Sequence, residues 1–343
     1  MSTLVDAGPR PARTAVGRLA LASLVANILI VVTGGAVRLT GSGLGCPTWQ
    51  ECTGTTADRP GSFVPHGELG AHGVIEFGNR LLTFVLVAVA VATLFAVWRT
   101  RPARRSLRRL GLLLALGIPA QAVVGGVTVL TDLNPWLVAL HLMLSMVLIS
   151  LAVVLVHRVD EGDGPARPTM SPAAVWLVRT TFALTWMVLY VGTVVTGSGP
   201  HAGDADVPRN GLDPAVTSQL HASLVFLLIG LTVGAVFALR ATGAPRDAVM
   251  AAQVLFGVEL AQGLVGFVQY ATDLPVVLVG LHLLGATLVV VAATRLLLMT
   301  ATAARPRERD EWRKPSPSCR VAQTVVNQEV RATRLRHSVD PWQ

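Results

Sequence analysis

Two stretches of the chain repeat each other: QAVVGGVTVLTDLNPWLVALH at 121–141 and QGLVGFVQYATDLPVVLVGLH at 262–282. They align without a gap at a constant offset of 141 residues, so that Gln121 matches Gln262 and His141 matches His282. Duplication of one structural unit is the simplest explanation of such a repeat. The sequence therefore predicts a protein built from two similar halves.

The chain around this repeat is apolar. Of its 343 residues, 52% are hydrophobic and only 14% are charged, which is more apolar surface than a soluble domain requires. A helix crosses a hydrocarbon core of about 30 Å with roughly 20 residues. Apolar stretches of that length lie at 17–37, 71–97, 108–130, 136–157, 174–195, 216–239, 247–270 and 276–299. We therefore predict an all-α integral membrane protein with eight transmembrane helices, the first of which is retained rather than cleaved as a signal peptide.

Four spans make up each half. VTGGAVRLTGSG at 32–43 resembles VGTVVTGSG at 191–199, and in both cases an odd-numbered span ends there. Because an even number of spans returns the chain to the same side of the membrane, the two halves run in the same direction. We predict two pseudo-symmetric four-helix bundles, an amino-terminal bundle at 17–157 and a carboxy-terminal bundle at 174–299.

Arginines predict the orientation. The connections after the second, fourth and sixth spans hold Arg99, Arg101, Arg104, Arg105, Arg108, Arg109, Arg158, Arg167, Arg240 and Arg246, and the opposite connections hold Arg38, Arg59 and Arg209. By the positive-inside rule, the arginine-rich connections face the cytoplasm. Residues 1–16 and 300–343 are then cytoplasmic, and the tail, rich in Arg, Pro and Ser, is expected to be disordered. The net charge of +8 reflects this topology and the tail, and we expect no nucleic-acid site.

Two of the three cysteines, Cys46 and Cys52, fall together in the first outer connection, where oxidising conditions allow a disulfide. Two roles stay open for the pair. One is a structural staple, and the other is an exposed disulfide that exchanges electrons with outside thiols. Cys319 lies alone in the cytoplasmic tail and is expected to be an ordinary thiol.

Ionisable residues inside the spans are the candidates for function, because they are costly in lipid. They are His72, Glu76, His141, His221, Glu259 and His282. The four histidines share a depth, within about two turns of the outer ends of even-numbered spans. A lone helical histidine is more often a satisfied interior group, but repeated histidines at one depth indicate a planar metallocofactor, because imidazole is an axial ligand of haem iron. We predict a haem held by His221 and His282, and we disfavour zinc because no local cluster of ligands appears.

The amino-terminal half is not a copy at this place. Aligning the second span with the sixth brings Asn79 onto or next to the position of His221. His72, Glu76 and Asn79 are spaced i, i+4 and i+7 and share one helix face. The carboxylate of Glu76 is a candidate general base or stabiliser of positive charge on a reacting group. The alternative is a salt bridge from Glu76 to Arg80 at i+4.

The motifs RLTGSGLGCP at 38–47, IEFGNR at 75–80 and VTGSGPHAGD at 195–204, with the paired histidines, resemble the haem A synthase family over residues 17–299. This resemblance implies an oxidoreductase that oxidises the C8 methyl group of haem O to a formyl group by successive hydroxylations. It places haem O, the substrate, in the amino-terminal bundle. It also implies that His221 and His282 hold a haem b that relays electrons.

The family's Glu-x-x-His-Arg motif maps its acid and its arginine to Glu76 and Arg80, with Asn79 in place of the histidine. The mapping leaves His141 as the amino-terminal iron ligand, with His72 as the candidate substitute for the missing one. The resemblance also implies a role in the bacterial cytoplasmic membrane, with the haem sites toward its outer face.

The family's outer cysteine pair maps to Cys46 and Cys52, which many members join as a disulfide. The partners expected from the resemblance are haem O, the protohaem farnesyltransferase that makes it, and a membrane electron acceptor. The identity of the acceptor and the oligomeric state, a homo-oligomer included, stay open.

Two other functions compete. A non-catalytic dihaem b-type electron carrier fits the histidines but gives no reason for Glu76 or for the unequal halves. A haem or quinone transporter is permitted by the duplicated bundle.

Overall fold

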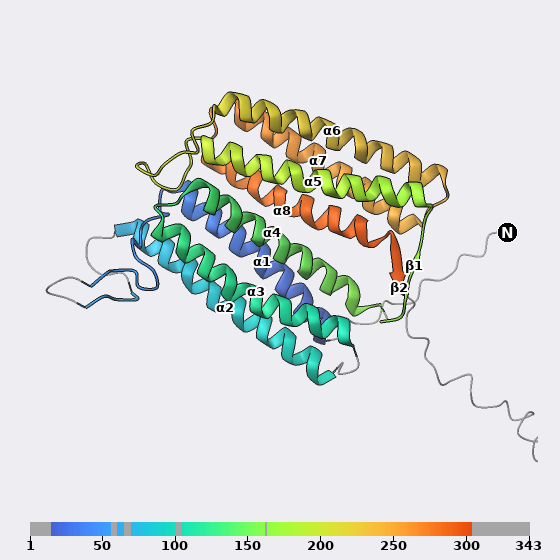
Figure 1. Ribbon diagram of the computed structural model, residues 1–343, viewed down its shortest axis with the longest axis horizontal. Coiled ribbons are helices and arrows are strands. Elements are labelled where there is room, and N and C mark those ends of the chain that lie inside the picture. The colour runs from blue at the N-terminus through green and yellow to red at the C-terminus, as the bar shows by residue number, and fades with distance from the viewer. Residues whose placement is uncertain (1–14, 56–59, 65–69, 101–103, 162, 304–343) are drawn as a thin grey trace, which may run out of the picture.

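The computed structural model describes residues 15–55, 60–64, 70–100, 104–161 and 163–303 (Figure 1). Its helices are α1 Ala15–Leu39, α2 Gly70–Thr100, α3 Arg105–Leu130, α4 Pro135–Val159, α5 Pro172–Ser198, α6 Pro214–Ala241, α7 Arg246–Ala271 and α8 Val276–Leu298. All eight are long and apolar enough to cross a membrane. The predicted all-α class with eight spans is confirmed.

Most helices extend up to three residues beyond the apolar stretches that predicted them, and at the starts of α4, α5 and α6 a polar capping residue lies outside the stretch. Ser171 precedes α5 and Asp213 precedes α6, and each side chain accepts hydrogen bonds from backbone N–H groups of the first turn. Proline follows each cap, where its missing N–H costs nothing. Hydropathy therefore marks the lipid-crossing part of a helix, and capping marks its end.

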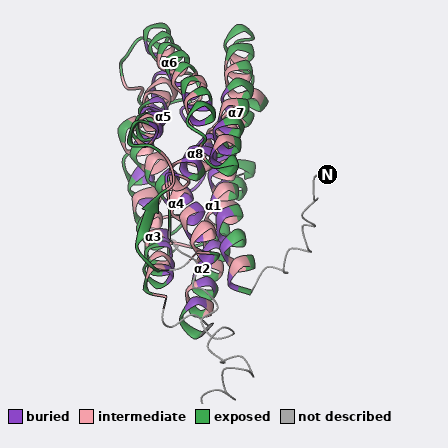
Figure 2. Cartoon of the chain, turned by 90° about the vertical axis from the view of Figure 1, so that its right-hand side faces the viewer, coloured by how far each residue is buried: buried purple, intermediate pink, exposed green. Residues whose placement is uncertain are grey.

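The helices form two four-helix bundles. In the first, α1 packs on α2 and α4, and α3 packs on the same two helices; α5, α6, α7 and α8 repeat this arrangement. The bundles meet where α8 packs on α1 and α4 and where α4 packs on α5, and buried residues gather along these contacts (Figure 2). Large apolar side chains such as Phe226 and Phe267, 74% and 75% exposed, cover the outside, as expected of a surface that faces lipid.

The connections that follow the odd-numbered helices lie at one end of the molecule, which we call the disulfide end. The turns after α3 and α7 have the same conformation, with positive φ at Asp132 and Leu133 and at Asp273 and Leu274. The duplication is therefore visible in the backbone. Two further contacts join these connections: Gly43 N donates to Gly203 O at 2.9 Å, and His201 Nε2 lies 2.8 Å from Leu274 O.

At the opposite end, strand β1 (Ala166–Pro168) pairs antiparallel with β2 (Ala301–Ala303). The expectation that the tail is disordered from residue 300 is wrong for these residues, because a ladder of backbone hydrogen bonds does not require apolar side chains. Residues 1–14 and 304–343, which include Cys319, lie outside the described residues.

Candidate functional site

The carboxy-terminal bundle brings His221 of α6 and His282 of α8 together. Their ring centroids are 6.5 Å apart and the ring planes are inclined by 74°. A metal–imidazole bond is about 2 Å long and a ring centre lies about 1 Å beyond its nitrogen, so one metal ion between two imidazoles separates the centres by about 6 Å. The predicted pair is thus close enough for one metal ion to bind both rings, and the same separation is that of two rings in edge contact.

A glycine on the preceding odd-numbered helix faces each of the three bundle histidines. The pairs are Gly125 with His141, Gly192 with His221, and Gly266 with His282, and in each a Cβ added to the glycine would lie 3.1 Å from the histidine Cε1. Asn79 has a similar relation to Gly34, whose added Cβ would lie 3.8 Å from Nδ2. Asn79 therefore occupies the position in the first bundle that His221 occupies in the second. Sequence reasoning missed these glycines, although two of them lie in the repeat at one offset.

Polar atoms at two of these positions lack partners: Nδ1 of His141 and Oδ1 of Asn79 are buried without a hydrogen bond. The His221 and His282 rings instead interact with the backbone of Val188 and Gln262. A metal-binding imidazole is usually held in this way through one ring nitrogen while the other nitrogen binds the metal. Across the described ranges, no three His, Cys, Asp or Glu side chains gather around one point. A closed zinc site takes four ligands, whereas a haem needs only axial ligands from the protein.

Repeated glutamines hold the histidine helices in place. Gln121 Nε2 of α3 donates to His141 O at 2.9 Å, and Gln262 Nε2 of α7 donates to His282 O at 2.7 Å. Each bond ties an odd-numbered helix to its partner at the residue that presents the imidazole. The glutamines of the repeat thus position the histidines.

His72 lies apart from the other three histidines. It is exposed in the first turn of α2, and its Nδ1 lies 2.8 Å from Ser42 Oγ. The predicted shared depth does not hold closely for this residue: His72 is in the first turn of α2, whereas the other three histidines are in the second turns of their helices.

Glu76 and Arg80 form the i,i+4 salt bridge that was the alternative reading of Glu76. The Glu76 side chain is buried, with the residue 6% exposed. Its Oε1 accepts from Arg80 Nη2 at 2.6 Å and from Nε at 3.1 Å, and its Oε2 accepts from Cys46 N at 2.6 Å. Arg80 also donates to the carbonyls of Cys46, Thr48 and Glu51 at 3.0, 3.1 and 3.3 Å. The pair therefore holds the chain around the cysteines.

Cys46 and Cys52 are joined as a disulfide, and both residues are 0% exposed. Residues 42–52, which we call the disulfide loop, pack on the ends of two helices. A Cβ added to Gly126 of α3 would overlap the Trp49 ring, and one added to Gly45 would overlap the backbone of His72. The loop thus covers part of the disulfide end of the first bundle, and its buried sulfurs favour the structural role over an exposed redox pair.

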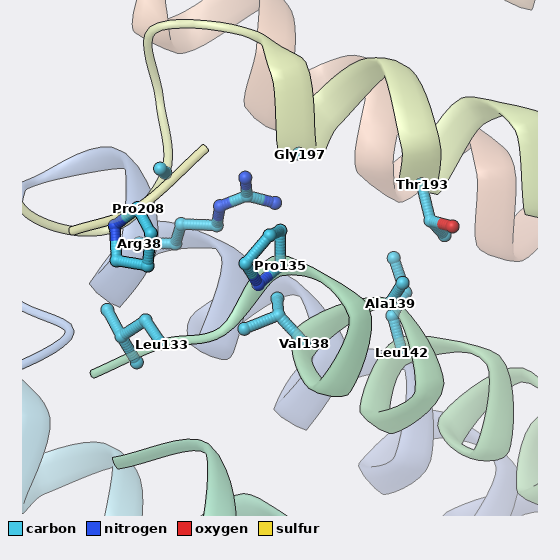
Figure 3. A pocket seen from close by; sticks show the side chains of 10 residues that line it. Arg38, Leu133, Pro135, Val138, Ala139, Leu142, Thr193, Gly197 and Pro208 are labelled. Carbon is cyan, nitrogen blue, oxygen red and sulfur yellow. The ribbon is translucent and has the colours of Figure 1, made fainter. Parts of the chain in front are cut away.

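A small cavity lies between the bundles near the disulfide end, lined by Arg38 of α1, Pro135 of α4 and Thr193 of α5 (Figure 3). Arg38 Nη2 crosses from the first bundle to donate to Thr196 O of the second at 2.8 Å. The cavity volume of about 10 Å³ is close to what a single water requires. It is a packing gap and not a cofactor site.

Comparison with known proteins gives matches of two kinds. Residues 17–209 match the family described as cytochrome oxidase assembly protein. Heme A synthase of Lysinibacillus sphaericus is 32% identical over 183 residues, covering 51% of this chain and 56% of that protein. Heme A synthase of Methylobacterium radiotolerans is 32% identical over 203 residues, covering 51% and 54%. The matched segment thus spans just over half the length of these two relatives. A longer match, 28% identical over 323 residues, covers 80% of this chain and 90% of heme A synthase of Azorhizobium caulinodans.

Proposed function

The chain belongs to the cytochrome oxidase assembly protein family, which matches residues 17–209, and from this premise we propose that it is a haem A synthase. The proposed reaction is oxidation of the C8 methyl group of haem O to a formyl group by successive hydroxylations. The relatives named heme A synthase support the proposal. The single observation that carries it is the spacing of His221 and His282.

We propose that these two histidines hold haem b. Their 6.5 Å centroid separation, the glycines that face them and the backbone groups that hold their rings all fit a six-coordinate haem. When bound, such a haem supplies one-electron transfer at an iron with no open position. His221 and His282 would hold and orient it, and Gln262 would fix the helix segment that carries His282.

The amino-terminal bundle is the proposed substrate site. His141 stands there where His282 stands in the second bundle, while the position of His221 is taken by Asn79. A neutral amide is a poor iron ligand compared with imidazole, so haem O would have one imidazole ligand. Two imidazoles suit an electron relay, and a single imidazole leaves one face of the iron for chemistry.

Glu76 is the proposed catalytic carboxylate of this bundle, because it lies on α2 three residues before Asn79. Both of its oxygens accept hydrogen bonds, from Arg80 and from Cys46 N. Each carboxylate oxygen keeps a lone pair that could take up a proton. The hydrogen bond from Cys46 N ties the position of Oε2 to the disulfide loop.

The arginine distribution supports an orientation with the disulfide end outside and both termini in the cytoplasm. Haem O carries a long apolar side chain, so we propose that it enters from the bilayer after synthesis by a protohaem farnesyltransferase. A membrane electron acceptor would remove the electrons released by the oxidation.

Extraction of haems from the purified protein tests the proposal. After co-expression with a farnesyltransferase, we expect haem O or haem A beside haem b. Haem b alone would indicate an electron carrier instead. His221→Ala and His282→Ala should each abolish the low-spin haem b spectrum, because one axial imidazole is lost. His201→Ala, at a histidine of the α5–α6 connection, is the control and should keep it. Unchanged spectra in both bundle variants would refute the assignment.

A further inference from the structure

Glu259 is a buried acid that the proposed reaction does not use. It lies in the middle of α7 and is 3% exposed. Its Oε1 accepts a hydrogen bond from the hydroxyl of Thr232 on α6 at 2.9 Å, and its Oε2 is buried without a partner. An ionised carboxylate in such a place is costly unless a positive charge compensates it. The site therefore suits a group that is neutral in one state of the protein and charged in another.

The position of Glu259 relates it to the histidine pair. Glu259, Gln262 and Gly266 are spaced i, i+3 and i+7, so they lie on one side of α7. Gly266 faces the His282 ring, and Gln262 donates to His282 O. At 1.5 Å per residue, Glu259 lies about 10 Å along the helix from Gly266, toward the middle of the bundle. One side of α7 thus carries Glu259 together with the two residues that contact His282.

The first bundle has the equivalent glutamine and glycine but not the acid. At the offset of 141 residues, Gln121 and Gly125 match Gln262 and Gly266, whereas Ile118 matches Glu259. Ile118 is 1% exposed and belongs to the first bundle's core. The fold of a bundle therefore does not need an acid here. At this position the acid occurs only in the bundle whose histidine pair the proposed function assigns to electron transfer.

Among the described residues, no cation forms an ion pair with Glu259. The ionisable groups on the helices packed against α7 are His221 and Arg240 on α6 and His282 and Arg295 on α8, and α7 itself carries Arg246, Asp247 and Tyr270. The three arginines lie in the terminal turns at the end opposite the disulfide end. In the part of the chain that the structure describes, no salt bridge involves Glu259. An oxidised haem bound between the two histidines would supply the positive charge that these side chains do not.

Building on the proposed haem b site, we propose that Glu259 is the proton-binding group that balances the charge of that haem. In the oxidised protein the iron and its porphyrin dianion carry one net positive charge, which favours an ionised Glu259 carboxylate. When one electron reaches this haem from the oxidation of haem O, that positive charge is cancelled, and Glu259 takes up one proton to form a carboxylic acid. When the membrane electron acceptor removes the electron, Glu259 releases the proton, so charge and atoms balance in both directions.

The test is a potentiometric titration of the full-length, haem-loaded protein with redox mediators, followed by haem absorbance at several pH values. Where Glu259 titrates with the haem, a tenfold fall in proton concentration should lower the midpoint potential by up to about 59 mV. Glu259→Gln should keep the low-spin spectrum and flatten this dependence. Thr232→Val removes only the hydrogen bond to Oε1. It should keep the slope of midpoint potential against pH but shift the pH range in which the potential changes.

The outcomes separate the two proposals. A wild-type protein without a low-spin haem would refute the haem b site and the proton site together. A normal haem spectrum with the same pH slope in wild type and Glu259→Gln would refute the proton site alone. If Glu259→Gln does not retain haem, infrared difference spectra between the reduced and oxidised wild-type protein test the proton site. Reduction should produce a protonated-carboxyl band that shifts in deuterated water, and its absence would overturn the inference.

Discussion

Replacing Glu76 by glutamine should loosen the disulfide loop without unfolding either bundle. The carboxylate accepts two hydrogen bonds from Arg80 and one from Cys46 N, while Arg80 itself donates to three loop carbonyls. Glutamine keeps one acceptor oxygen but removes the charge that orients the guanidinium. The loop then depends on an arginine whose own position is less fixed.

The size of the effect follows from the bonds that change. A hydrogen bond to a charged group contributes about 1.5–3 kcal/mol, and the arginine keeps its loop acceptors, so we expect Glu76→Gln to lower the free energy of loop opening by about 2 kcal/mol. Glu76→Ala also leaves Cys46 N without its acceptor and should cost about 3 kcal/mol. At 1.4 kcal/mol per factor of ten, these values correspond to openings that are roughly thirty-fold and over a hundred-fold more frequent.

The reduction rate of the disulfide measures this opening. Both cysteines are 0% exposed, so a phosphine reductant reaches the sulfurs only when the loop opens, and the rate tracks the open population if reclosing is fast. All proteins should carry Cys319→Ser, so that maleimide labelling reports the loop alone. Glu161→Gln is the matched control, because it removes one negative charge from ion pairs with His157 and Arg158 at the opposite end.

Reduction of both Glu76 variants at the wild-type rate, equal to the control, would refute the idea that this salt bridge holds the loop. The same Glu76→Gln protein also tests the proposed catalytic role. If Glu76 serves the oxidation, haem A formation should fall while haem b stays bound and haem O or a hydroxylated intermediate accumulates. Wild-type haem A levels in extracted haems would end that proposal.

Three further predictions follow from individual positions. Gly126→Ala should displace the indole that packs on it and speed disulfide reduction at least tenfold, whereas Gly78→Ala, which meets nothing within 4 Å, should not. Gly266→Ala should weaken the low-spin haem b spectrum because its Cβ would crowd the facing imidazole, and Gly263→Ala on the same helix, with open space, should leave the spectrum unchanged. Burial alone would raise the pKa of Asp163, but hydrogen bonds from the start of α3 outweigh it and lower the pKa below its ordinary value of 3.8. The ionised Asp163 therefore stabilises the fold by less than about 1 kcal/mol at this surface. This stabilisation is present above pH 4 and is lost as pH falls through the lowered pKa. The melting temperature of Asp163→Asn should therefore fall less than that of the wild type as the pH is lowered.

The sequence by itself determined the membrane class, the span number and the duplication. Span length and hydropathy are local properties, because lipid requires each helix to satisfy its own backbone. The offset of 141 residues made His282 the counterpart of His141. Depth along neighbouring spans was enough to pair His221 with His282, because helices that cross the same bilayer share a coordinate along its normal. His72 shows the limit of that argument, since it lies one turn nearer the helix end than the other three histidines and is exposed.

Only the tertiary structure decided which groups meet around the helices. The contact of Glu76 with Cys46 depended on the path of the disulfide loop, which crosses from α1 to α2 outside any periodic pattern. The pairing of Gly192 with His221 and the isolation of Glu259 Oε2 depend on how neighbouring helices are rotated and spaced. Hydropathy does not encode that rotation, because side-chain packing between helices fixes it residue by residue.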